Sequence, residues 1–290
     1  MSRLTNPAYI RPLLEKNGFH FSRSMGQNFL IDASVPERIA ESVQADENCS
    51  VPEIGPGIGC LTEELSQRAG QVITVELDRR LSPVLEETLS GRDNVDVLYA
   101  DVMKLNLREV AEQKMRFPVK LVCANLPYNI TSPVLTALIQ AGCFERICVM
   151  IQKEVAQRIC AGPGTKDYGA FGLFVQWHCE TELLFTVPPH CFLPAPKVTS
   201  AVILLKRRET PPAETEDDDL MLRVIRAAFG QRRKTLVNAL AAGIPGLGKN
   251  ECEKILAGLN LETNIRGEML KLGDFARISN EIKAVQEANL

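Results

Sequence analysis

Apolar and polar positions follow two alternating patterns along residues 36–152. Short runs rich in β-branched residues alternate with stretches whose apolar positions recur every three or four residues. The runs predict strands at 49–54, 71–76, 95–100, 118–124 and 146–151. The stretches around them predict helices at 36–44, 61–68, 80–89, 105–113 and 133–141. Repeated alternation of this kind is typical of a mostly parallel sheet covered by helices, so we expect an α/β fold.

The pattern changes after residue 152. Two further strands, at 180–187 and 198–205, flank a proline-rich loop and are expected to close one edge of the sheet as a hairpin. Residues 209–219 are acidic, carry prolines and lack a periodic apolar face, which predicts a linker. Helices are then predicted at 220–229, 235–242, 249–258 and 268–285. The chain therefore divides into a sheet domain at 1–208 with a basic N-terminal arm at 1–30, a linker at 209–219, and a helical domain at 220–290.

Composition excludes several classes of protein. Of the 290 residues, 45% are hydrophobic and 24% are charged, so a disordered or fibrous chain is excluded. Polar residues and prolines interrupt the longest uncharged run, at 121–144, and charges are spread through the first 23 residues. We therefore expect neither a membrane span nor a secretory signal, and we predict a cytoplasmic protein.

The metal-binding residue types show no ligand pattern. The nine cysteines include no C-x-x-C pair, and His20, His178 and His190 share no ligand spacing with them. We expect reduced thiols, no disulfides and no metal site.

A glycine-rich loop follows the first predicted strand. Gly55, Gly57 and Gly59 stand between that strand and a helix, where glycines let the backbone approach a ligand. On the glycines alone, a tight turn without a ligand is the alternative. No Lys-Ser or Lys-Thr pair ends the loop, so a P-loop is excluded. Pro52, inside the strand, lacks a ladder donor and is expected at a loose end or a local irregularity.

Polar residues also end the next three predicted strands. They are Glu76, Asp101 and Asn125, at regular intervals along the chain. In an open parallel sheet the ligand crevice lies outside the carboxyl ends of the strands, so we expect these residues and the glycine loop to face one cavity. Glu76 is placed to bind a ribose diol and Asp101 to accept from an adenine amino group. The ribose position is shared by NAD and S-adenosylmethionine, so spacing alone does not choose between them.

A tetrapeptide after the fourth strand points to a family. Asn125-Leu126-Pro127-Tyr128, with the glycine loop, resembles the N-P-P-Y-type motif of class I, S-adenosylmethionine-dependent amino-methyltransferases. Three more segments make the chain resemble the small-subunit rRNA adenine dimethyltransferases along nearly its whole length: Gly-Gln-Asn-Phe-Leu at 26–30, Phe-Leu-Pro-Ala-Pro-Lys-Val at 192–198, and Phe-Gly-Gln-Arg-Arg-Lys-Thr-Leu at 229–236. The resemblance implies a Rossmann-like sheet of seven strands, mostly parallel with an antiparallel last strand, and a small helical C-terminal domain.

The resemblance also implies site residues. The S-adenosyl-L-methionine cofactor would contact Asn28, Leu30, Gly55, Gly57, Glu76, Asp101 and Asn125. The Asn125 side chain and the Leu126 carbonyl would accept protons from adenine N6, while Tyr128 and Phe192 would pack against the base. For Phe192 a plain core position is the alternative. Thr199 and Gly267 depart from the common family pattern.

A basic patch lies in the predicted helical domain, although the formal net charge of the chain is −3. It comprises Arg223, Arg226, Arg232, Arg233 and Lys234. Such a patch is typical of a polyanion-binding surface, with a solvated helix face as the alternative. The N-terminal arm is also basic, with Arg3, Arg11, Lys16, His20 and Arg23 against Glu15. The expected partner is structured small-subunit rRNA in an assembling subunit, with no membrane partner, and the protein is expected to be a monomer.

The implied function is methylation in ribosome biogenesis. Methyl groups would pass to the N6 amino groups of two adjacent adenosines in a hairpin near the 3′ end of small-subunit rRNA. The alternatives are a resistance-type methyltransferase of large-subunit rRNA and a non-catalytic RNA-binding assembly or transcription factor.

Overall fold

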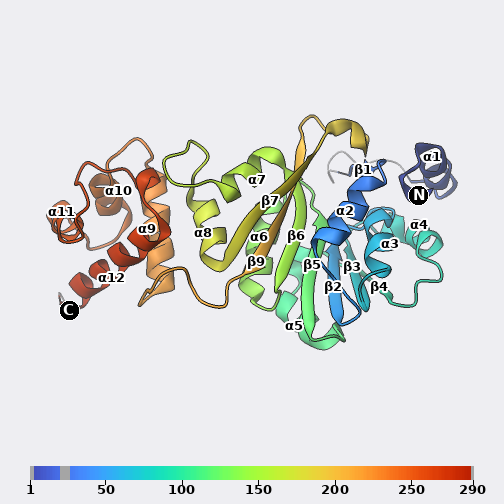
Figure 1. The fold of residues 1–290 in the computed structure, drawn as a ribbon, viewed down its shortest axis with the longest axis horizontal. Helices are drawn as coiled ribbons and strands as arrows, with labels where there is room; N and C mark the ends of the chain where they lie inside the picture. Colours follow the sequence, from blue (N-terminus) through green and yellow to red (C-terminus); the bar gives the residue numbers. More distant parts are fainter. Residues whose placement is uncertain (1–2, 20–26, 289–290) are drawn as a thin grey trace. The chain divides into compact units, whose positions relative to one another are not determined.

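The computed structural model describes residues 3–19 and 27–288, which form two compact units (Figure 1). The first unit contains Met1–Ala156 and Thr181–Arg207, and the second contains Gln157–Glu180 and Arg208–Leu290. The first unit ends within one residue of the predicted boundary at 208. Residues 157–180, which the sequence placed in the first domain, instead pack with the second unit. His20, Arg23 and Gly26 lie outside the described residues.

The first unit is built on a seven-stranded sheet with the order β4-β3-β2-β5-β6-β9-β7. The strands are β2 (Cys49–Ile54), β3 (Gln71–Glu76), β4 (Val95–Tyr99), β5 (Val119–Asn125), β6 (Arg146–Gln152), β7 (Cys179–Val187) and β9 (Ser200–Arg207). Strands β2 to β6 pair in parallel, and β9 pairs antiparallel with β6. The expected sheet is therefore confirmed. The predicted hairpin also closes one edge of the sheet, with β9 between β6 and the edge strand β7.

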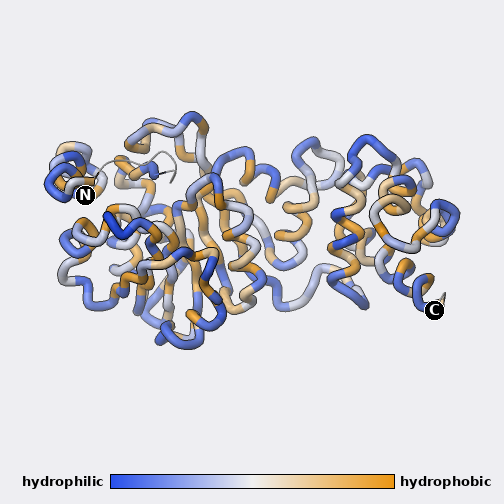
Figure 2. Tube along the Cα trace, turned by 180° about the vertical axis from the view of Figure 1, so that it is seen from behind, coloured by the Kyte–Doolittle hydropathy of each residue, from blue (hydrophilic) through white to orange (hydrophobic). Residues whose placement is uncertain are grey.

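Burial explains why these runs become strands. Every residue of β2 and β3 is buried, as expected for central parallel strands with helices on both faces, whereas the edge strand β4 is partly exposed. The apolar residues accordingly follow the strands in Figure 2. Pro52 lies in the middle of β2, where it is in register with Ile73 of β3. Toward β5 the ladder skips from Ser50 to Glu53, so Pro52 causes the expected local irregularity and not a loose strand end.

Among the described residues of the first unit, six helices lie wholly within it and a seventh begins there. They are α1 (Pro7–Lys16), α2 (Ser34–Ser42), α3 (Cys60–Ser66), α4 (Ser82–Thr88), α5 (Leu107–Lys114), α6 (Thr131–Ala141) and α7 (Lys153–Cys160), with short 3-10 turns at Arg3–Thr5, Arg79–Leu81, Val102–Lys104 and Pro189–Cys191. The five predicted helices are present. Helices α1 and α7 were not predicted, although Asn6 caps α1 by accepting from the Ala8 N–H at 2.9 Å.

A two-stranded ladder joins two distant segments of the first unit. Strand β1 (Phe29–Leu30) pairs antiparallel with β8 (Phe192–Leu193), with Phe29 opposite Leu193 and Leu30 opposite Phe192. The Ile31 N–H extends the ladder by donating to the Cys191 carbonyl at 2.8 Å. The proline-rich segment therefore fixes the position of residues 29–31.

The second unit is helical. Its helices are α8 (Ala170–His178), α9 (Asp218–Gly230), α10 (Leu236–Gly243), α11 (Lys249–Gly258) and α12 (Leu272–Ala288), with a 3-10 turn at Gly267–Met269. The core includes Trp177 and Phe275, and the buried Tyr168 hydroxyl donates to the Leu270 carbonyl at 2.9 Å. Part of the predicted linker belongs to α9, because Asp217 caps this helix by accepting from Leu220 at 2.8 Å. No helix in the described parts of the chain is long and apolar enough to cross a membrane.

Candidate active site

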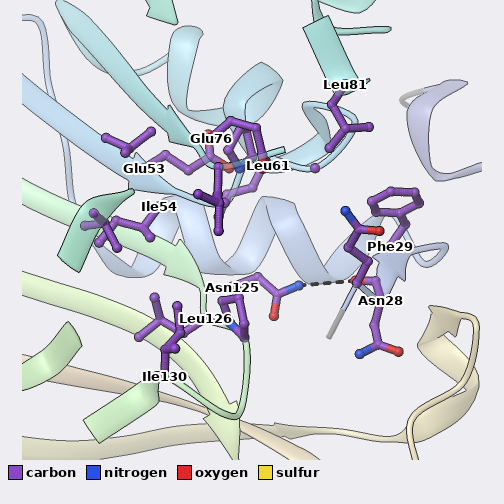
Figure 3. A pocket seen from close by; sticks show the side chains of 18 of the residues that line it. Asn28, Phe29, Glu53, Ile54, Leu61, Glu76, Leu81, Asn125, Leu126 and Ile130 are labelled. Atoms are coloured by element: carbon purple, nitrogen blue, oxygen red, sulfur yellow. Dashed lines mark hydrogen bonds between the residues drawn. The ribbon is translucent and has the colours of Figure 1, made fainter. Parts of the chain in front are cut away.

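A pocket opens in the first unit at the carboxyl ends of β2, β3, β4 and β5 (Figure 3). Nine of the ten residues predicted for catalysis or cofactor binding line it: Asn28, Leu30, Gly55, Gly57, Glu76, Asp101, Asn125, Leu126 and Tyr128. These residues come together because the carboxyl ends of parallel strands meet at the same edge of the sheet, which is where open parallel sheets bind ligands.

The glycine loop forms one wall through a backbone path that favours glycine. Gly55, Gly57 and Gly59 all have positive φ, at 72°, 60° and 92°. A Cβ on Gly57 would also come within 3.1 Å of the Phe29 ring. A side chain at Gly57 would therefore require both backbone strain and movement of the opposite wall.

Glu76, the last residue of β3, is held by main-chain donors and is only 7% exposed. Its Oε1 accepts from the Asp78 N–H at 2.7 Å, and the N–H groups of Gly57 and Leu77 also bond to the carboxylate. Burial raises its pKa above the usual value, whereas these backbone donors oppose that shift by stabilising the ionised form. The result is a carboxylate fixed at the pocket wall.

The segment before β1 closes the pocket from the other side. Gln27 donates to Asp78 Oδ2 at 2.9 Å, and Asp78 also binds the Arg80 guanidinium. These donors hold the pKa of Asp78 below its usual value. The Asn125 Nδ2 donates to the Asn28 carbonyl at 3.5 Å, the dashed contact in Figure 3. Asn28 is therefore linked to the end of β5, and its neighbour Gln27 to the loop after β3.

The Asn125-Leu126-Pro127-Tyr128 turn is anchored on both of its flanks. The Leu126 N–H donates to the Met150 carbonyl of β6 at 3.1 Å, and the Ile130 N–H donates to the Pro127 carbonyl at 3.2 Å. The Tyr128 hydroxyl bonds to Ser200 Oγ of β9 at 2.7 Å, which orients the ring from its far end. Burial raises the pKa of Tyr128, so its hydroxyl is neutral at physiological pH.

Asp101 lies at the carboxyl end of β4 and is partly exposed. Its Oδ1 accepts from the Met103 N–H at 3.0 Å, which caps a 3-10 turn, and its Oδ2 lies 4.0 Å from Lys104 Nζ. One carboxylate oxygen of Asp101 therefore caps the 3-10 turn, while the other lies near the ammonium group of Lys104.

Phe192 is the predicted residue that the structure does not bring to the pocket. Its side chain is 3% exposed, belongs to the main hydrophobic core and is absent from the pocket wall. The cause is the β1–β8 ladder, which turns this ring inward opposite Leu30. The position supports the alternative interpretation of Phe192 as a core residue.

The structure adds Glu53, which the sequence analysis left inside a strand. Its side chain is 1% exposed, lines the pocket and accepts from Thr62 Oγ1 at 2.6 Å. Burial, with a smaller contribution from the charge of Glu76, raises its pKa to about 8. Glu53 stands two residues before the glycine loop, but a strand pattern does not reveal a carboxyl buried beside a cavity.

The predicted RNA-binding residues lie in the second unit, and all five are exposed. Arg223 and Arg226 project from α9, whereas the other three follow its end. Arg232 differs from its neighbours because its guanidinium contacts the Lys166 carbonyl at 3.1 Å and Glu268 at 3.3 Å. Gly267, a departure from the family pattern, packs so closely on Ala228 that a Cβ would come within 2.8 Å of the alanine Cβ.

The remaining metal-binding residue types are dispersed. All nine cysteines lie in the described residues, and none of them forms a disulfide. Within residues 3–19 and 27–288, no three His, Cys, Asp or Glu side chains are grouped in a way that could hold a metal ion.

The strand order, the antiparallel β9 and the crevice pocket define a class I methyltransferase fold. The fold matches a crystal structure of the 23S rRNA methyltransferase ErmE over 88% of this chain and 99% of that one, with a TM-score of 0.68 and 27% identity. It also matches a dimethyladenosine transferase from Plasmodium falciparum, with a TM-score of 0.73, 24% identity and coverage of 90% and 98%. The chain belongs to the ribosomal RNA adenine dimethylase family, whose profile matches residues 18–284.

Two relatives support this membership over nearly their full lengths. The ribosomal RNA small subunit methyltransferase A of Alkaliphilus metalliredigens is 42% identical, over 99% of this chain and 100% of its own. The protein of the same name from Geobacillus kaustophilus is 43% identical, over 96% and 97%.

Proposed function

We propose that this protein transfers methyl groups from S-adenosylmethionine to the N6 amino groups of adenosines in small-subunit rRNA, forming N6,N6-dimethyladenosine during ribosome biogenesis. Its relatives with 41–44% identity carry the name ribosomal RNA small subunit methyltransferase A. The observation that carries the proposal is that the Asn125–Tyr128 turn shares one pocket with the glycine loop and Glu76.

The pocket residues fit a nucleoside-bearing methyl donor. S-adenosylmethionine supplies a methyl group already activated on a sulfonium. The backbone of Gly55 and Gly57 leaves room for close approach, Glu76 presents a fixed carboxylate to a ribose diol, and Asp101 accepts from an adenine amino group. The main task of the chain is to hold donor and acceptor in line, which contributes up to about 7–11 kcal/mol in favourable cases.

The Asn125–Tyr128 turn fits the acceptor. Adenine N6 is a poor nucleophile because its lone pair is delocalised into the ring. The Asn125 amide oxygen and the Leu126 carbonyl can accept the two N6 protons and so localise the lone pair, without the cost of burying a further ionised carboxylate. Tyr128 offers a stacking face, which returns about 1–3 kcal/mol of the energy spent in extracting the base.

The exposed basic patch of the second unit fits the phosphates of the RNA substrate. Structured rRNA is the proposed partner because a loop or unpaired adenine is extracted most easily. A monomeric state and a cytoplasmic location stay predictions from the sequence.

The test incubates the protein with labelled S-adenosylmethionine and small ribosomal subunits that lack the modification, followed by nucleoside mass spectrometry. We expect labelled N6,N6-dimethyladenosine. The Asn125→Ala variant serves as the matched control, since it should bind RNA normally but transfer no methyl groups. Label on cytosine or guanine, or equal turnover by the variant, would contradict the proposal.

Large-subunit rRNA is the second candidate substrate, because the fold also matches a 23S rRNA methyltransferase. The same assay with large subunits separates the two candidates. We expect labelling of small subunits alone, and preferential labelling of large subunits would reverse the assignment. Binding of small subunits without any labelled product would instead favour a non-catalytic assembly factor.

A further inference from the structure

Glu53 is a carboxyl group that the proposed transfer reaction leaves without a role. It lies on β2, the central strand of the site, and its side chain faces the same pocket as Glu76 of β3 (Figure 3). Both are nearly inaccessible to water, at 1% and 7% exposure. Two carboxylates in one buried pocket repel each other, so their charge states are linked.

The two carboxyl groups differ in the hydrogen-bond donors that reach them. Glu76 accepts from backbone N–H groups, which favour its ionised form. Glu53 receives one neutral hydroxyl, from Thr62, and no ion pair in the described residues includes it. A hydroxyl can donate to a carboxylate or accept from a carboxylic acid, so Thr62 accommodates either state of Glu53.

The two thiols near Glu53 do not titrate in the neutral range. The ionisable groups that face it are Glu76 from β3, the Cys60 thiol from α3 and the Cys123 thiol from β5. Burial raises the pKa of Cys60 to about 12 and that of Cys123 well above its usual value, so both thiols stay neutral. Burial raises the pKa of Glu53 itself to about 8, which is consistent with a neutral carboxyl at pH 7.

We propose that Glu53 is a proton-linked counterion of the methyl donor, releasing its proton to solvent when the cationic donor enters the pocket. This inference rests on the proposed function, because S-adenosylmethionine carries a sulfonium and an ammonium charge. A cation beside a buried carboxylate favours the ionised form, so donor binding and proton release occur together. Glu53 then acts as a positioning residue that recognises the positive charge of the donor.

The linkage fixes the direction of the pH dependence. Below the pKa of free Glu53 the donor must displace a proton, so its affinity rises with pH, by at most about tenfold per pH unit. Above that pKa the carboxyl is already ionised and adds no further pH dependence, while the α-ammonium of the donor itself loses its proton at about pH 8. A neutral adenosine thioether has no charge to be matched and should bind without releasing a proton.

Titration calorimetry of the full chain with S-adenosylmethionine tests this at about pH 5.5 to 7.5, below the ordinary pKa of the α-ammonium of the donor, in two buffers of different ionisation enthalpy. At pH 7 we expect release of up to about one proton per donor bound. The Glu53→Gln variant keeps a polar partner for Thr62 and should bind the donor with little pH dependence and without that release. The wild-type protein with 5′-methylthioadenosine, which lacks both positive charges, gives the same comparison without any variant.

Several results would overturn the inference. One is a pH-independent affinity of the wild-type protein for S-adenosylmethionine, and another is undiminished proton release by Glu53→Gln, which would place the proton on Glu76. Equal proton release with 5′-methylthioadenosine would show that the charge of the donor is not recognised. Failure of the wild-type protein to bind S-adenosylmethionine at any pH would instead contradict the proposed function, and the inference would fall with it.

Discussion

At the residue scale, the pocket assigns different tasks to chemically similar groups. Glu76 and Glu53 are both buried glutamates, but backbone donors surround one and a single hydroxyl reaches the other. The sequence predicted Glu76 because strand ends are recognisable from the apolar pattern. It did not predict Glu53, because the role of this carboxyl depends on its burial beside a cavity that only the assembled sheet creates.

Tyr128 gives the test of residue-scale chemistry. Tyr128→Ala should lower kcat/KM for rRNA methylation by about 5- to 150-fold, because it removes a stacking surface worth about 1–3 kcal/mol. Tyr128→Phe keeps the ring and loses only the bond to Ser200, so its activity should stay within about tenfold of wild type. Ser200→Ala removes the same bond from the other side and should match Tyr128→Phe in steady-state assays. If Tyr128→Phe were inactive while Ser200→Ala remained active, the hydroxyl would take part in the reaction.

At the scale of elements, regular segments were predictable and short or non-local ones were not. The five parallel strands were located to within a residue at each end, because buried β-branched runs leave a strong pattern. The two-residue strands β1 and β8 are too short to leave one. Their pairing depends on residues far apart in the chain. It places the Phe192 side chain in the core and not in the pocket, and the local sequence could not predict this position.

Phe192 tests the role of that ladder. As a core residue it should tolerate Phe192→Leu at a cost below about 1.5 kcal/mol with methylation largely retained, whereas Phe192→Ala should cost about 3–5 kcal/mol through the cavity it leaves. Urea unfolding and steady-state kinetics of both variants measure this. A stable Phe192→Leu protein with activity as low as that of Tyr128→Ala would restore the stacking role.

The basic patch belongs to the same scale, because it depends on the end of α9. Arg233→Ala with Lys234→Ala should weaken binding to small subunits and reduce the log–log salt slope by about 0.7–0.9 for each phosphate that the protein no longer neutralises. The charge-matched control replaces Lys249 and Lys254, exposed on α11, and should leave the slope unchanged. Equal slopes for both double variants would identify the patch as a solvated helix face. Arg232 is left intact because its contact with Glu268 also supports the fold of the second unit.

At the scale of the whole molecule, buried acids make stability depend on pH. The folded state binds a proton at Glu53 up to about pH 8, whereas the unfolded chain releases it near pH 4.5. The free energy of unfolding should therefore fall as pH rises between these values, by at most about 5 kcal/mol from this group. Asp78 contributes to the pH dependence of the free energy of unfolding with the opposite sign. Because its pKa is lowered in the folded state, the stability that it contributes is lost only as the pH falls below about 4.

Urea unfolding at pH 5 and pH 8.5 measures the predicted fall in the free energy of unfolding with rising pH. The wild-type protein should be less stable at the higher pH, and Glu53→Gln should show a clearly smaller fall. Glu112→Gln, on an exposed position of α5, is the matched control and should behave as wild type. An equal fall in all three proteins would assign the pH dependence to other groups.

The pairing of β1 with β8 also sets the moment at which the pocket is completed during synthesis. The ribosome releases the chain from its N-terminus, so the glycine loop, Glu76 and Asn125 all emerge well before Leu193. Until β8 leaves the exit tunnel, β1 has no partner strand, and the segment that contains Asn28 is held without it, by contacts such as those with Asn125 and Asp78. A nascent chain therefore carries most of the pocket residues before the β1–β8 ladder can form, and the pocket is complete only once the proline-rich segment has been made.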